Sequence, residues 1–197
     1  MVLAALALWA VGAMPASAEP AQSPQGFGNI PFGSPKEKAL ALNAGNGQMS
    51  ENPDKTATLS YSTVVAGISF DVAQNFDREG RATDAKLTYS TREQSNACVD
   101  RFNFVLAQLS QRYGKPQAPT VSRREDASGA RSDYYTIAFT FADQSAVKAD
   151  MKDTYPPQAP GGAAKGGAAP AGAAGGDTVS ACEITLQYLP PRWTTHF

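Results

Sequence analysis

Ser145 and Lys148 form an S-x-x-K sequence, the spacing at which a lysine can assist a serine nucleophile. The amine takes the hydroxyl proton when the two side chains lie one helical turn apart. The partner motifs S-D-N and K-T-G are absent from the chain. The motif also follows an expected strand instead of opening a buried helix. We therefore keep an envelope serine hydrolase as an alternative function only.

Other residues with catalytic chemistry are scattered along the chain. His196 is the only histidine, so neither a histidine-based triad nor a multi-histidine metal site is expected. Asp71 with Asp77, or Asp150 with Asp153, could do acid/base chemistry, but the sequence does not place either pair in one cleft. The glycines form neither a G-x-G-x-x-G motif nor a P-loop. We predict no catalytic set, no cofactor and no metal site.

The two cysteines, Cys98 and Cys182, are predicted to form a disulfide. Helical spacing places Cys98 on an apolar stripe with Phe102, and alternation places Cys182 on the inward face of a strand with Ile184. The pair lacks the CxxC spacing of a redox site and has no histidines nearby for a metal site. Two buried cysteines in an oxidising compartment indicate a structural bridge.

The N-terminal residues indicate an export signal. Residues 2–13 form an apolar run, and Ala16 to Ala18 offer the small side chains that a signal peptidase accepts. We expect residues 1–18 to be removed and the mature protein to be periplasmic or secreted. The run is shorter than the roughly 20 residues of a transmembrane helix, and no later segment comes close. Because no Lys or Arg precedes the run, we also expect the true start to lie upstream of Met1.

The charge balance argues against two classes of partner. The chain has 17 Lys and Arg against 18 Asp and Glu, a formal net charge of -1. Such a balance does not favour nucleic acid or anionic lipid. The remaining length suits one domain, which we place at residues 30–189, after a disordered segment at 19–29 and before a C-terminal tail at 190–197.

Capping residues predict two helices. Ser34 and Glu37 form a capping box for a short helix over residues 35–44. Residues 95–113 carry apolar side chains at helical spacing, and Gly114 provides the stop.

Alternating apolar residues predict three strands after each helix. The sequence Asp77 to Gly80 is a hairpin turn, because Asp favours turn entry and Gly accepts a positive φ. Residues 156–176, rich in Gly, Ala and Pro, are expected to be a flexible insertion in the last hairpin. The expected fold class is α+β, built from two helix-plus-three-strand units with the helices packed on one face of an antiparallel sheet. The expected strands lie near residues 59–61, 68–72, 85–89, 120–124, 133–141 and 178–189.

Such a sheet leaves its other face open, and aromatic side chains there could bind a protein. Most strand aromatics fit the buried alternation. Tyr61, Tyr134 and Tyr155 are the candidates for the open face or its edge, and hence for partner binding.

Three segments together resemble small secreted bacterial envelope domains, namely the outer-membrane-assembly small lipoproteins and the β-lactamase-inhibitor proteins. They are the run Ile30 to Glu37, the turn Phe76 to Arg81 and the sequence Tyr113 to Pro116. The resemblance implies helices on an antiparallel sheet and binding of partner proteins. The chain departs from these families in having no lipidation Cys after the signal, and no functional residue is carried over.

The leading hypothesis is therefore a non-enzymatic periplasmic protein. It would bind another envelope protein through its open sheet face or its flexible insertion. The alternatives are the serine hydrolase using Ser145 and Lys148 and a carrier that holds a small amphiphile between helix and sheet.

Overall fold

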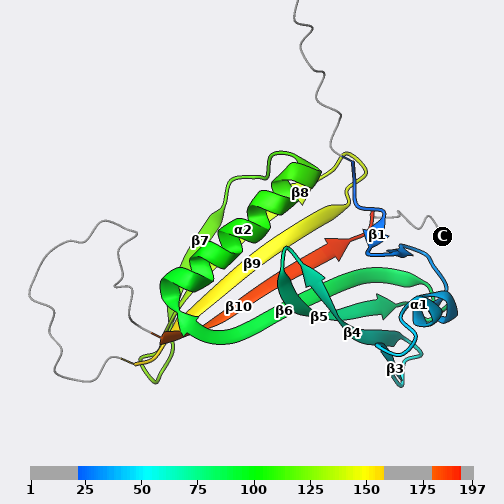
Figure 1. Cartoon of the computed structure of the whole chain (residues 1–197), viewed down its shortest axis with the longest axis horizontal. Coiled ribbons are helices and arrows are strands. Elements are labelled where there is room, and N and C mark those ends of the chain that lie inside the picture. Colours follow the sequence, from blue (N-terminus) through cyan, green and yellow to red (C-terminus); the bar gives the residue numbers. More distant parts are fainter. Residues whose placement is uncertain (1–21, 158–178, 192–197) are drawn as a thin grey trace, which may run out of the picture.

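The computed structural model describes residues 22–157 and 179–191 (Figure 1). Two helices and ten strands form in this part of the chain. The helices are α1 (Lys36–Leu42) and α2 (Ser95–Tyr113). The strands are β1 (Gly26–Phe27), β2 (Ile30–Pro31), β3 (Gln48–Glu51), β4 (Ala57–Val65), β5 (Ile68–Phe76), β6 (Ala82–Gln94), β7 (Thr120–Glu125), β8 (Arg131–Thr140), β9 (Ala146–Tyr155) and β10 (Val179–Leu189).

Eight strands form one antiparallel sheet in the order β3-β4-β5-β6-β10-β9-β8-β7. Each half is a helix followed by a meander of four strands. The last strands of the two halves, β6 and β10, pair at the centre of the sheet. The antiparallel sheet with helices is as expected, but each unit has four strands and the prediction of three was wrong.

The two missed strands are β3 and β9. Strand β3 has four residues and none of them is buried, so it carries almost no alternation signal. Strand β9 alternates strictly, with Val147, Ala149 and Met151 buried. Lys148 and Lys152 occupy alternate positions between them. Because these charged residues interrupt the apolar sequence, β9 was not predicted as a strand. Burial of its other face nevertheless fixes it in the sheet.

The main core lies between α2 and the sheet. Helix α2 packs on β6, β10 and β9, and its stripe of buried residues includes Phe102, Val105 and Leu109. The facing sheet side chains include Leu87 and Ile184, which are fully buried. The space between helix and sheet, where an amphiphile carrier would hold its ligand, is therefore filled by side chains.

The predicted disulfide between Cys98 and Cys182 is present and joins the first part of α2 to β10. Both residues are buried, and their Cα atoms lie 5.8 Å apart. Helix α2 has the predicted bounds, and Gly114 follows it with a φ of 81°, a conformation that favours glycine.

Helix α1 packs on the same side of the sheet as α2 but over a separate apolar cluster, where Ala39 meets Leu59 and Phe76. The predicted cap was wrong. The N-cap is Pro35, and no side chain caps the helix. Ser34 is instead tied to the start of β6, because its carbonyl accepts a hydrogen bond from the backbone N–H of Ala82 at 2.9 Å.

The predicted hairpin turn between β5 and β6 is confirmed. Oδ1 of Asp77 accepts backbone hydrogen bonds from Glu79 and Arg81, both at 2.9 Å, and Gly80 has a φ of 72°. A carboxylate that satisfies two turn amides fixes this corner of the sheet.

Part of the segment predicted to be disordered is ordered. Strands β1 and β2 pair with each other, and the ring of Phe27 lies 4.9 Å from that of Tyr188. This contact places the strand pair against the sheet, because Phe27 finds an apolar surface there. The predicted signal segment, nearly all of the insertion and most of the C-terminal tail, including His196, lie outside the described residues.

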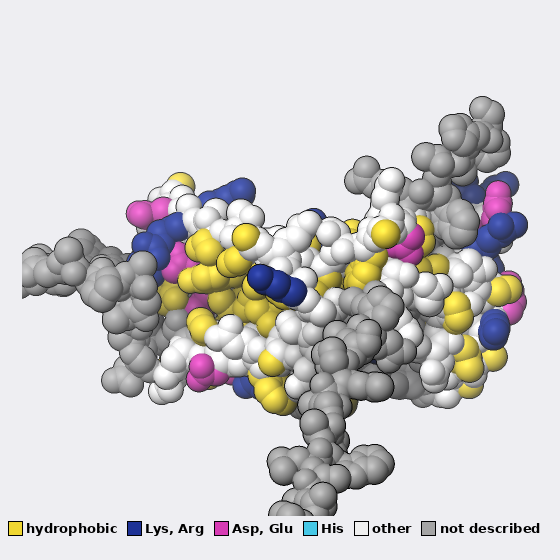
Figure 2. All heavy atoms as spheres, turned by 90° about the horizontal axis from the view of Figure 1, so that it is seen from above, with side chains coloured by type: hydrophobic (Ala, Val, Ile, Leu, Met, Phe, Trp, Pro, Cys, Tyr) yellow, Lys and Arg dark blue, Asp and Glu magenta, His cyan; other side chains and the backbone are white. Residues whose placement is uncertain are grey.

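No helix in the described part of the chain is long and apolar enough to cross a membrane. Viewed from above, apolar side chains gather in the left half of the molecule, where Figure 1 places α2 and β7 to β9 (Figure 2). Charged side chains lie mainly toward the two ends of this view.

Candidate binding face of the sheet

The side of the large sheet opposite α1 and α2 is its open face. Along each strand the residues between the buried ones point to this side, because side chains alternate across a sheet. One row of directly paired residues runs across it from β4 to β8, and every member carries a hydroxyl or a carboxylate. The row is Ser62, Asp71, Thr88, Thr185, Asp150 and Thr136.

Hydroxyls and carboxylates in this row bond to each other. Ser62 Oγ donates to Oδ1 of Asp71 at 3.1 Å, and Thr136 Oγ1 donates to Oδ1 of Asp150 at 2.5 Å. Thr185 is only 7% exposed, although neither helix of the described chain lies on this side. Side chains of the neighbouring strands therefore cover Thr185 at the middle of the open face.

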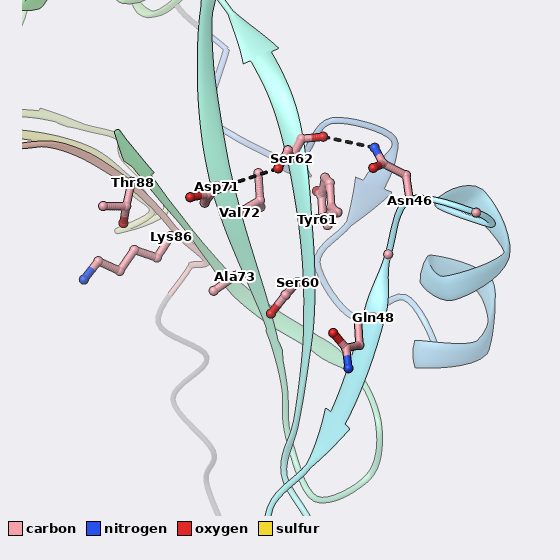
Figure 3. A pocket seen from close by; sticks show the side chains of 12 residues that line it. Asn46, Gln48, Ser60, Tyr61, Ser62, Asp71, Val72, Ala73, Lys86 and Thr88 are labelled. Carbon is pink, nitrogen blue, oxygen red and sulfur yellow. Dashed lines mark hydrogen bonds between the residues drawn. The ribbon is translucent and has the colours of Figure 1, made fainter. Parts of the chain in front are cut away.

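A hollow of about 580 Å³ lies over β4, β5 and β6 beside the loop that precedes β3 (Figure 3). The loop is held to β4 by Asn46, whose Nδ2 donates to the backbone carbonyl of Ser62 at 3.2 Å. Lys86 and Thr88 lie on the far side of the hollow from Asn46 and Gln48. Half of the residues that line it carry hydroxyl or amide groups, which suit hydrogen bonding to a polar surface.

A second hollow, of about 350 Å³, lies over β6, β10 and β9. Its floor includes the small side chain of Ala181, and Arg92 and Lys152 rise on either side. Ser90 and Thr154 add hydroxyls to the rim. The carboxylate of Glu183 also lines the hollow, so two cations face one anion. The excess of positive charge, together with the hydroxyl donors, suits an anionic group.

A third hollow, of about 740 Å³, lies at the other end of β8, β9 and β10. Ala138 and Ala146 leave space on the sheet, Leu189 and Pro190 form an apolar border, and Lys148 provides one charge. The three hollows thus lie at different places along one face of one sheet.

The three candidate tyrosines do not share this face. Tyr134 is on it, with the cations of Arg124 and Lys152 at 5.4 Å and 5.8 Å from its ring centre. Tyr61 and Tyr155 have the parity of the helix side, although Tyr61 lies where β4 extends past the edge strand β3 and also lines the 580 Å³ hollow. Their role in partner binding stays a prediction.

The parity of these two tyrosines follows from the alternation of the strands that carry them. Tyr61 has the same parity as the buried Leu59 and packs against both apolar clusters. This burial raises the pKa of Tyr61 to about 12. Tyr155 has the parity of Met151, and its hydroxyl donates to Oδ2 of Asp153 at 2.8 Å.

Ser145 and Lys148 are not arranged as a nucleophile and base. Ser145 is fully buried just before β9, and its hydroxyl donates to Oδ1 of Asp143 at 2.5 Å. This bond, with the backbone bond at 3.0 Å, lowers the pKa of Asp143. Lys148 lies on the open face instead. Residues three apart along a strand point to opposite sides of the sheet, which keeps the two side chains apart. Ser145 instead belongs to the turn before β9, where it bonds to Asp143.

The carboxylate pairs weighed as acid/base sets are likewise separated. Asp71 lies on the open face, whereas Asp77 holds the hairpin turn. Asp150 lies on the open face, whereas Asp153 is buried on the helix side. Each carboxylate therefore has a different environment from its supposed partner.

Glu93 lies close to both sulfur atoms of the disulfide, but it does not form a metal site with them. The cysteines are oxidised to each other and offer no thiolate. Glu93 pairs with Arg101 of α2 at 2.8 Å, and the Arg101 guanidinium lies 5.1 Å from the ring centre of Tyr89. These contacts fix α2 on β6.

Sequence reasoning missed an ion-pair cluster around a buried carboxylate, Asp133, on the helix side of β7 and β8. Asp133 is 6% exposed and accepts hydrogen bonds from Arg123 Nε at 2.6 Å and Nη2 at 3.2 Å. Arg131 approaches the same carboxylate at 3.4 Å. The parity of Asp133 with Tyr135 and Ile137 was the available signal, because it places the carboxylate on the inward face.

Comparison of the chain with protein-family models, with curated proteins and with solved structures finds no match.

Proposed function

We propose that this chain is an exported, non-enzymatic protein that binds another envelope protein through the open face of its sheet. The observation that carries the proposal is the polar open face, which neither described helix covers and which is hollowed in three places. The disulfide supports export, since such bonds persist in oxidising compartments.

The size of the open face suits a protein partner. Seven spacings of about 4.8 Å across the sheet and about 20 Å along the strands give an area on the order of 700 Å². A stable protein–protein interface buries about 800 Å² on each partner. The short Ser and Thr side chains lose little conformational entropy when a partner covers them.

The chemistry of the described residues favours binding over catalysis. Ser145 is committed to Asp143, and the carboxylate pairs lie in separate environments. The polar groups of the open face are instead spread over several strands. Spread polar groups suit recognition of a surface better than attack on one bond.

Site-specific photocrosslinking tests the proposal. A benzophenone side chain at Lys86 or Ser90 would lie on the open face, and one at Gln108 would lie exposed on α2 as the matched control. In envelope extract, the two open-face positions should give one stoichiometric protein product and Gln108 none. Equal products from all three positions, or none from the open face, would contradict the proposal.

The flexible insertion is the other route by which the partner could be held. A chain lacking residues 161–175 should still give the open-face product if the sheet carries binding. If this variant lost the product while circular dichroism showed an intact fold, the insertion and not the sheet would carry binding.

A further inference from the structure

Three cations are spread along one end of the open face, between the central strand β6 and the edge strand β7. We name Arg92, Arg124 and Lys152 the basic corner. One row of direct partners links the two arginines across five strands, in the order Arg92, Ala181, Thr154, Ser132 and Arg124. Lys152 lies in the neighbouring row, two residues from Thr154 on β9. The 350 Å³ hollow over Ala181 opens between Arg92 and Lys152.

The basic corner has no counter-charge within ion-pair distance in the described part of the chain. Ion pairs among those residues involve Lys36, Arg81, Arg101, Arg123 and Arg131, and none lies on the open face. Glu183 is directly opposite Lys152 in the register, yet it forms no ion pair with it there. Arg101, Arg123 and Arg131 on the helix side are thus paired with carboxylates of the protein, whereas the basic corner is not.

Tyr134 keeps two of these cations in place. Its ring lies between Arg124 and Lys152, at 5.4 Å and 5.8 Å from the two charges. Contacts of this kind stabilise a cation without neutralising it. They also reduce the conformational entropy that Lys152 and Arg124 lose when an anion binds.

We propose that the basic corner receives the carboxylates of an acidic segment of the partner protein, an inference that rests on the proposed function. Side-chain carboxylates fit the hollow over Ala181, where Arg92 and Lys152 supply charge and Ser90 and Thr154 supply hydroxyl donors. Glu183 at the rim and a net charge of -1 oppose a continuous polyphosphate. A protein segment, which can alternate carboxylates with neutral groups, suits this mixed surface better.

The test uses an oligoglutamate peptide and the full exported chain, with binding followed by amide chemical shifts. The variant Arg92→Gln with Lys152→Gln removes two cations from the corner, and Lys38→Gln with Arg78→Gln removes two exposed cations elsewhere. We expect shifts along β6, β10 and β9 at low salt. The corner variant should bind about tenfold more weakly, and the control variant should bind within about twofold of the wild type.

Equal weakening in both variants would overturn the inference, because the attraction would then be general. Tighter binding of inorganic phosphate or of phosphatidylglycerol vesicles than of the peptide, lost in the corner variant, would also overturn it in favour of a phosphate ligand. Open-face photocrosslinking of the corner variant separates the two proposals. An undiminished product there refutes the basic corner alone, whereas no product from the wild type refutes the proposed function.

Discussion

Replacing both Cys98 and Cys182 by Ala should lower the free energy of unfolding by about 4.6 kcal/mol at 25 °C. The value follows from a sequence separation of 84 residues, because a cross-link removes loop-closure entropy from the unfolded chain. Alanine leaves no unsatisfied polar group at either buried site, so the entropy dominates the change. Single domains have only about 5–15 kcal/mol of stability in total. The double variant should therefore be close to unfolded at physiological temperature.

The measurement is urea unfolding of the oxidised wild type and the variant, followed by circular dichroism. The midpoint should fall strongly in the variant. The matched control is deletion of residues 161–175 with the disulfide intact, which shortens the cross-linked loop and changes the same entropy by only about 0.2 kcal/mol. Equal midpoints for wild type and double variant would refute the reasoning, as would a deletion that destabilises as much as loss of the bridge.

Three other changes test further parts of the structure. Asp133→Asn should lower the free energy of unfolding, measured by urea denaturation, by about 1 kcal/mol, since it removes the carboxylate that Arg123 and Arg131 share; an unchanged midpoint would contradict this role. Stability should fall as pH rises from about 10, where a tyrosine of the unfolded chain ionises, through about 12, where Tyr61 ionises in the fold. Tyr61→Phe should lose less of its urea midpoint between pH 8 and pH 11, and an equal loss would contradict the role of Tyr61. A fluorophosphonate probe should label neither the wild type nor Ser145→Ala, because the Ser145 hydroxyl is buried against Asp143; labelling of the wild type alone would restore the hydrolase.

Features set by neighbouring residues could be predicted from the sequence. The bounds of α2, the turn at Asp77 and the burial of both cysteines depend on caps, turn residues and periodicity within a few positions. The cap at Ser34 failed because a distant strand, β6, takes its carbonyl. Local chemistry cannot show such a competitor.

The side of the sheet on which Tyr61 lies could have been predicted from the sequence. Leu59 and Tyr61 are two residues apart, so burial of the first places the second on the same face. The basic corner could not be predicted from the sequence in this way. Arg92, Arg124 and Lys152 come together only through the order β6-β10-β9-β8-β7, and strand order is set by long-range pairing.

The central pairing of β6 with β10 imposes an order on the folding of the chain. Residues 85–94 cannot pair with residues 179–188 until these are made, after every other strand of the sheet, because synthesis proceeds from the N-terminus. Until then β6 and β9 each present an unpaired edge, the kind of edge to which other chains add. Insertion of β10 closes both edges at once. A chain truncated before β10 would keep both edges exposed, and we expect it to aggregate by pairing of these edges between neighbouring molecules.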